Sequence, residues 1–364
     1  MSGRFESAWI AAFAVAALTI SAHAGAEPYI AVQQGYKCIV CHENPTGGGL
    51  RTEFGVAFSE SVLPQTSMPA GFPTWTGHVF KFLQFGADAR WADMNTSVPN
   101  EPSMRLGRFE QIRAYGNLTL IPDRLSYYVD EELAPGNATP IEYYARYRDP
   151  TYGWYLKGGQ FYLPFGWRLQ DNTAFVREAS GISMTTPDRG FELGLEFPEW
   201  SAQLDYTRGE ENISVGTGHQ FTGQVVWVKS DWRVGAAAAF TQSVLGNREV
   251  QGVFAGLHTG RVAWLGEIDL VRDASYADGP RRSVAGLAEA DWAFSKGQNL
   301  KITSEYFDRN LSVANDQQTR WSFVYEYTPI PFLQLRAGWR RYRGIPQSDN
   351  DNRRLLFLEL HGFL

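Results

Sequence analysis

The sequence predicts an all-β protein, a transmembrane antiparallel β-barrel of about 16 strands, with a small α-helical segment before the first strand. Three observations support this prediction. Apolar and polar residues alternate from about residue 78 to residue 364, the connections between alternating segments are short and long in turn, and a segment typical of export signals opens the chain. Alternation with a period of two places successive side chains on opposite faces of a strand.

The alternation is clearest where aromatic and charged side chains follow one another. Phe191, Leu193 and Leu195 alternate with Glu192 and Glu196. A soluble β-sandwich alternates in the same way, so this pattern alone leaves two fold classes open. One apolar and one polar face also suit a strand that borders lipid on one side and a polar lumen on the other.

Segment length and loop length favour the barrel. The segments are roughly ten residues long, the length that a tilted strand needs to cross a bilayer. We predict strands over residues 78–92, 106–121, 124–133, 140–148, 153–163, 188–197, 200–208, 219–229, 231–241, 249–259, 261–272, 283–294, 299–308, 318–328, 332–342 and 353–364. Every second connection is tight, as at 121–123 and 329–331, and the others are long and polar, as at 93–104. Short turns on one side and long loops on the other indicate an outer-membrane barrel.

The composition and the first residues of the chain indicate the class of protein and its location in the cell. The chain has 364 residues, a hydrophobic fraction of 44% and a formal net charge of -6. These values exclude a disordered chain and argue against a nucleic-acid partner. An apolar run over 9–20 follows Arg4, so residues 1–26 are predicted to be a signal peptide. Alternation up to Leu364 resembles the closing strand of bacterial barrels, and we expect the bacterial outer membrane and contact with its lipid.

The polar faces of the predicted strands and one long connection suggest what lines the lumen. The connection from Pro164 to Pro187 carries Arg168, Asp171 and Arg177, and it either folds inward as a constriction or stays an exposed, charged loop. Several carboxylates have inward parity and are expected to draw cations through the lumen. They are Glu192, Glu196, Glu267, Asp269, Glu289 and Glu305.

The sharpest local motif lies before the barrel, in Cys38-Ile39-Val40-Cys41-His42. Two thiols with this spacing reach the vinyl groups of one haem, and the adjacent His is placed to ligate its iron. A zinc site needs four ligands, and no second pair follows at suitable spacing. A thioredoxin-like redox pair needs a βαβ context, and a structural disulfide does not require His42. We therefore predict one covalently bound haem c.

The segment that carries this motif is very small. Residues 27–63 are predicted to form a cytochrome c-like module, 64–77 a linker and 78–364 the barrel. A helical face over 50–58 offers Leu50 and Phe54 for packing on the haem, although both side chains equally suit packing against the barrel. A segment of this size rarely builds a sufficient core alone, so the haem is expected to supply much of it.

Three residues are candidates for the second axial ligand of the iron. Met68, on the linker, lies at a suitable distance in sequence and would raise the reduction potential. His78 and His361 have inward parity on the first and last strands, which pair in a closed barrel, so we expect them near each other at the periplasmic mouth. Both histidines equally suit a polar lumen lining.

The arrangement resembles the monohaem cytochrome c-porin fusions of the bacterial outer membrane, among them the iron-oxidising members. The resemblance covers the architecture of the mature chain, and Cys38, Cys41 and His42 match as a motif. Residues 41–49 are also similar to other haem-attached barrel proteins. The resemblance implies electron transfer across the outer membrane, with an oxidoreductase activity toward an extracellular donor such as Fe(II) as one expectation.

Three functions follow as expectations. In the first, the haem lies in the lumen and moves electrons between an extracellular donor or acceptor and a periplasmic cytochrome. In the second, the barrel is a diffusion porin with a haem-bearing periplasmic appendage, and in the third it sheathes a separate multihaem cytochrome. Porin-like barrels are often trimers, so a homotrimer is also expected.

Overall fold

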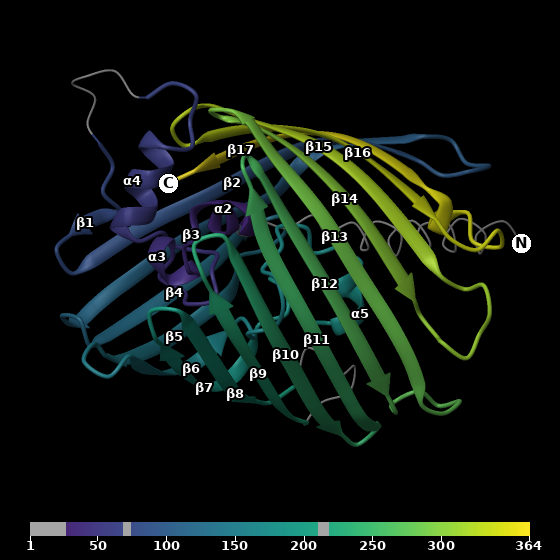
Figure 1. Ribbon diagram of the computed structural model, residues 1–364, viewed down its shortest axis with the longest axis horizontal. Coiled ribbons are helices and arrows are strands. Elements are labelled where there is room, and N and C mark those ends of the chain that lie inside the picture. The colour runs from purple at the N-terminus through teal and green to yellow at the C-terminus, as the bar shows by residue number, and fades with distance from the viewer. Residues whose placement is uncertain (1–26, 68–73, 210–217) are drawn as a thin grey trace, which may run out of the picture.

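The computed structural model describes residues 27–67, 74–209 and 218–364, and within these ranges seventeen strands form one antiparallel sheet (Figure 1). The short β1 pairs only with β2, and the other sixteen strands form a closed barrel, because β17 pairs with β2 and β9 with β10. The predicted antiparallel barrel of about 16 strands is confirmed, and the cytochrome c-like character of the segment before it stays a prediction. The strands are β1 (His78–Phe80), β2 (Leu83–Ser97), β3 (Met104–Ile121), β4 (Leu125–Ala134), β5 (Thr139–Asp149), β6 (Trp154–Phe161), β7 (Asp188–Glu196), β8 (Trp200–Thr207), β9 (His219–Val228), β10 (Trp232–Ser243), β11 (Gly246–Thr259), β12 (Val262–Asp273), β13 (Arg281–Ser295), β14 (Gln298–Asp308), β15 (Gln318–Ile330), β16 (Leu333–Arg343) and β17 (Arg354–Phe363).

The two faces of each strand differ as the alternation predicts. On β7, Phe191 and Leu193 are exposed on the outside of the barrel, whereas Glu192 between them is fully buried. On β17, Leu356 and Leu358 point outward and Phe357 is buried. The outer surface is therefore apolar and aromatic, which suits lipid, and closure gives each of the sixteen barrel strands a partner on both sides.

The first predicted strand differs from the observed one. Residues 78–92 do not form a single strand, because the chain turns back after Phe80 and His78 pairs with Gln84. β2 then runs on to Ser97, where it pairs with Arg354 of β17. The alternation of the sequence does not reveal this hairpin. Phe80 and Phe82 flank its turn, so the turn has the same apolar pattern as a continuous strand.

The N-terminal segment forms three short helices within and beside the barrel mouth: α2 (Pro28–Gln34), α3 (Cys38–Cys41) and α4 (Glu53–Ser61). Figure 1 shows α2 and α3 inside the outline of the barrel and α4 near the C-terminus. Thr52 caps α4, since its hydroxyl accepts a hydrogen bond from the Gly55 N–H at 3.1 Å. This cap is why the helix predicted over 50–58 begins at Glu53.

The short turns lie at the end of the barrel where this segment sits. Lys37 donates to the carbonyl of Phe197, beside the β7–β8 turn, at 2.7 Å. The N–H groups of Gln65 and Thr66 donate to carbonyls of the β15–β16 region at 2.8 and 3.1 Å. Among the described residues, no helix has the length and apolar character to cross a membrane. The predicted signal peptide lies outside the described residues.

The long connection between β6 and β7 folds into the barrel from the other end. It contains α5 (Phe175–Ser180), whose Phe175 and Val176 are almost fully buried. Arg177 pairs with Glu267 on β12, and the Phe175 N–H donates to Glu305 on β14 at 2.8 Å. Of the two readings of this loop, the inward-folded one therefore matches the structure.

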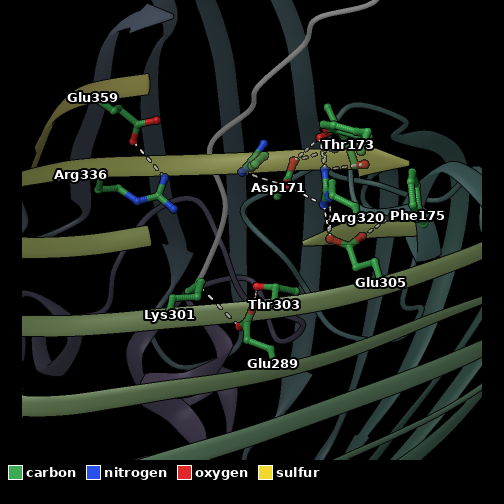
Figure 2. A network of polar contacts seen from close by, with 12 residues as sticks. Asp171, Thr173, Phe175, Glu289, Lys301, Thr303, Glu305, Arg320, Arg336 and Glu359 are labelled. Carbon is green, nitrogen blue, oxygen red and sulfur yellow. Dashed lines mark hydrogen bonds and ion pairs between the residues drawn. The ribbon is translucent and has the colours of Figure 1, made fainter. Parts of the chain in front are cut away.

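Figure 2 shows the polar network that docks this loop. Arg320 on β15 contacts Asp171 at 2.8 Å and Glu305 at 2.7 Å, measured from guanidinium nitrogen to carboxylate oxygen. It also donates to the Thr173 hydroxyl at 2.8 Å. One buried guanidinium thus joins two loop residues to two barrel strands.

Replacing Arg320 with Ala is expected to release the loop. Removing one partner of a buried ion pair costs about 3–5 kcal/mol, because the carboxylates of Asp171 and Glu305 are left without their main counter-charge. We expect faster proteolysis within 164–187 and a higher single-channel conductance. The matched control is Arg309→Ala, since Arg309 is more exposed and its ion pairs with Glu178 and Asp351 lie near the surface. Equal proteolysis rates for the two variants would contradict this account of the loop.

Candidate cofactor site in the barrel lumen

The three residues of the Cys-x-x-Cys-His motif line one large cavity. Cys38, Cys41 and His42 face a space of about 470 Å³, which is enclosed by the N-terminal segment, the inward loop and the barrel wall. Cofactor pockets in proteins typically measure about 300–1,000 Å³. Trp167 and Met184 enter the lining from the loop, and Phe254 enters it from β11.

The two cysteines are free thiols. Both side chains are half-buried, and burial raises the pKa of the Cys38 thiol. Burial and the neighbouring Cys38 raise the pKa of Cys41 to about 11. Both groups are therefore protonated thiols at neutral pH, and both are available on the side of α3 that faces the cavity.

His42 is held as a neutral imidazole. Burial, and next the positive charge of Arg51, lower the pKa of His42 to about 4. Neutral imidazole is the form that ligates metal ions. The backbone of Gly48 and Gly49 lies beside the ring, yet Nδ1 is buried without a hydrogen-bond partner among the described residues. A ligating His usually donates its other ring N–H to such a backbone carbonyl. Two free thiols and a half-buried imidazole line one cavity, and these are the residue types that would hold a covalently attached haem.

A close contact between α3 and α4 fixes the motif. The Thr52 N–H donates to the Cys41 carbonyl at 3.1 Å, and the Thr52 hydroxyl donates to the Val40 carbonyl at 2.7 Å. Gly55 allows this approach, because a Cβ atom there would lie 2.1 Å from the Cys41 carbonyl oxygen. His42 and Arg51 also form an isolated antiparallel bridge.

Leu50 and Phe54, the predicted packing residues, do not line the cavity. Leu50 is 1% exposed and packs against the wall at Gly86, and its N–H donates to the Tyr128 hydroxyl at 3.1 Å. Phe54 is 44% exposed, and its ring lies 5.5 Å from that of Tyr36. Leu50 thus adopts the barrel-facing alternative, and Phe58, one turn after Phe54, lines the cavity instead.

The three candidate axial ligands lie in different places. Met68 lies outside the described residues. His78 does not line the cavity, and its Nε2 lies 2.8 Å from a carboxylate oxygen of Glu53. On β2, His78 pairs with Gln84, whereas His361 pairs with Arg90 further along the strand. The expected proximity of His78 and His361 is therefore wrong. His361 does line the cavity, but its Nε2 contacts Asp88 and its Nδ1 lies 3.3 Å from Gln334 Oε1.

Met184 is a cavity residue that the sequence analysis did not single out. It lies on the inward loop, is 2% exposed, and its methyl group contacts Gly48, six residues after His42. Its position depends on how the loop folds, and the only signal in the sequence is that this loop contains a methionine.

The inward carboxylates are buried as predicted, but most are paired with cations of the chain itself. All six side chains have inward parity. Five of them lie close to a Lys or an Arg, and Glu289 also contacts the hydroxyl group of Thr303. These contacts are Glu192–Lys157 at 2.8 Å, Glu196–Lys37 at 2.5 Å, Glu267–Arg177, Glu305–Arg320 at 2.7 Å, and Glu289–Lys301 at 3.5 Å with Glu289–Thr303 at 3.0 Å. Asp269 lies 4.0 Å from Arg177. Internal ion pairs compensate much of their negative charge, and the expectation that they draw cations through the lumen stays a prediction.

Within residues 27–67, 74–209 and 218–364, no group of three or more His, Cys, Asp or Glu side chains is arranged to hold a metal ion.

Comparison with known proteins places the fold among porins. No protein-family model matches the sequence, and no curated protein is detectably similar to it. Solved structures are similar in shape: a loop-deletion mutant of OmpT, an outer membrane protein of Vibrio cholerae (TM-score 0.61, 11% identity, 78% of this chain and 100% of that chain); an anion-selective porin from Comamonas acidovorans (0.61, 8%, 78% and 99%); and OprB of Pseudomonas putida (0.62, 10%, 78% and 94%). At these identities the likeness establishes a porin-like barrel fold.

Gly55→Ala tests the contact between α3 and α4. The added methyl group meets the Cys41 carbonyl, and such overpacking costs about 1–3 kcal/mol. We expect the two helices to separate, so that a maleimide labels Cys38 and Cys41 faster in protein produced without haem attachment. Gly116→Ala is the control, because a Cβ there meets nothing within 4 Å. Identical labelling rates in the two variants would show that this contact does not hold the motif in place.

Proposed function

We propose that this protein carries electrons through one covalently bound haem c held in the lumen of an outer-membrane barrel. The electrons would pass between an extracellular donor or acceptor, such as Fe(II), and a periplasmic carrier. One observation supports this most directly: Cys38, Cys41 and His42 line the central cavity of the barrel.

The residues of the site would hold the group in three ways. Cys38 and Cys41 would form the thioether links, and His42 would be the first axial ligand. When bound, the haem supplies one-electron exchange at its iron. Leu50 anchors the segment that follows His42 to the wall, because its N–H donates to the Tyr128 hydroxyl, and Phe58 and Trp167 contribute apolar side chains to the cavity lining.

The lumen position would shorten the route across the membrane. The apolar band of such barrels is about 25 Å tall, so a redox centre below the barrel would be far from any extracellular partner. The N-terminal segment enters from the short-turn end, and the loop 164–187 enters from the opposite end. Both meet at the same cavity, to which Thr46 and Arg168 contribute.

The barrel supports a location of the protein in the outer membrane. Sixteen paired strands with an apolar outer face match the architecture of bacterial outer-membrane proteins. One similar structure is described as the trimer form of OmpT, which supports a homotrimer in contact with lipid. The short turns would then face the periplasm, where a soluble cytochrome would meet α4.

A diffusion porin is the second candidate, and the structural likeness favours it. One similar structure is an anion-selective porin. In that function the lumen would conduct, and the N-terminal segment would serve as an appendage at its periplasmic end. A sheath around a separate multihaem cytochrome is a third proposal, but α2, α3 and α5 occupy space that such a partner would need.

Haem content and conductance separate the first two functions. We expect the purified, processed chain to show the added mass of one haem, and Cys38→Ala combined with Cys41→Ala to lose it. We also expect poor ohmic conductance in planar bilayers, because two segments of the chain fill the lumen. A chain without porphyrin mass and with high conductance would leave a porin and exclude the electron carrier.

The axial ligands are tested by substitution in the haem-bearing protein. His42→Ala is expected to abolish the low-spin spectrum. Met68→Ala and Met184→Ala are compared next, since a thioether ligand raises the midpoint potential and its loss lowers it. His361→Gln is the third variant, because both imidazole nitrogens of His361 already have partners in the structure. If neither methionine variant changes the spectrum or potential while His361→Gln does, the ligand is His361.

A further inference from the structure

Two arginines beside Cys38 differ from the other basic groups of the lumen. Arg168 lies on the inward loop and Arg233 on β10, and both line the cavity with Cys38. Arg233 is 4% exposed. Their positive charges are the two strongest acting on the Cys38 thiol, so both guanidinium groups lie near the motif. Among the described residues, neither has a carboxylate at ion-pair distance.

Most other buried Arg and Lys side chains in the barrel lie at ion-pair distance from a carboxylate, so Arg168 and Arg233 differ from them. The pairs join guanidinium or ammonium nitrogens to carboxylate oxygens at about hydrogen-bond distance. Examples are Arg113–Asp130 at 3.2 Å, Lys157–Glu192 at 2.8 Å, Arg336–Glu359 at 3.1 Å, Lys301–Glu27 at 2.8 Å and Arg146–Glu43 at 2.9 Å.

The contacts that Arg168 and Arg233 do make are with neutral groups. Arg233 Nη2 donates to the carbonyls of Ala31 and Tyr36 at 2.7 and 2.5 Å. Arg168 donates to the Thr46 hydroxyl, and its guanidinium carbon lies 4.8 Å from the centre of the Tyr162 ring. These contacts orient the side chains without forming an ion pair, and a guanidinium has five N–H donors to offer. The carboxylate of Glu142 acts on Arg168 only from beyond ion-pair distance, and the charge of Lys157 acts on Glu142 more strongly than that of Arg168.

We propose that Arg168 and Arg233 bind the propionate carboxylates of the haem. This inference rests on the proposed function and adds the residues that recognise the anionic edge of the cofactor. Burying a cation without a nearby counter-charge is unfavourable, and a carboxylate on the ligand supplies that counter-charge. Arginine suits the role because its planar fork binds a carboxylate through two parallel hydrogen bonds.

The pair also affects the redox equilibrium. Reduction adds one negative charge to the haem, and two nearby positive charges stabilise the reduced state relative to the oxidised state. Removing either charge should therefore lower the midpoint potential. A purely structural role for Arg233, through Ala31 and Tyr36, predicts no such change when Arg168 alone is replaced.

The test is a redox titration of the full-length haem-bearing protein. Arg168→Gln and Arg233→Gln are each expected to lower the equilibrium constant for reduction by about tenfold, which is about 59 mV for a one-electron couple. The double variant should show a larger decrease, and Arg233→Lys should restore most of the potential by restoring the charge. Arg272→Gln is the control, because Arg272 is exposed on β12 and does not line the cavity.

The outcomes separate this inference from the proposed function. If Arg233→Gln fails to fold, Arg168→Gln decides, since it removes a single hydrogen bond to Thr46. Fully haem-loaded variants whose potentials equal that of the wild type would overturn the arginine assignment and leave the electron carrier standing. A wild-type chain without haem would overturn both.

Discussion

Charge pairing inside a closed barrel is the constraint on which this structure depends. Sixteen strands direct alternate side chains into the lumen, and many of these side chains are charged. Because the chain itself fills much of that space, most of these charges are buried and require an opposite charge nearby. Arg113 meets Asp130 and Lys157 meets Glu192 within the wall, whereas Arg320 meets residues of the inserted loop.

The N-terminal segment takes its position from the same kind of contact. Glu27 lies 2.8 Å from Lys301, Lys37 lies 2.5 Å from Glu196, and the buried amide of Asn44 donates to Glu142 at 2.9 Å. A segment of fewer than about 40 residues rarely forms a core of its own. The barrel wall supplies the packing that the segment lacks, so the orientation of α3 is determined by residues far away in sequence.

Two segments of the chain itself occupy part of the barrel lumen. Large barrels commonly enclose a water-filled lumen. Here the inward loop and the N-terminal segment meet around one cavity that displays two free thiols, an imidazole and two arginines that have no carboxylate at ion-pair distance among the described residues. Each of these features is compatible with a porin-like barrel, and they are the residues on which the proposed cofactor site rests.

The sequence by itself determined the sixteen barrel strands and the Cys38–His42 motif, because two-residue alternation and thiol spacing are local properties. Only the tertiary structure decided which side chains meet at the cavity. The direction of Leu50 and the approach of Met184 and Arg233 to the motif depend on contacts between segments that are far apart in the sequence, and the separation of His78 from His361 depends on a turn that the alternation conceals. A residue pattern specifies the face of a strand on which a side chain lies, whereas its partner across a lumen is set by barrel closure and by the balance of buried charge.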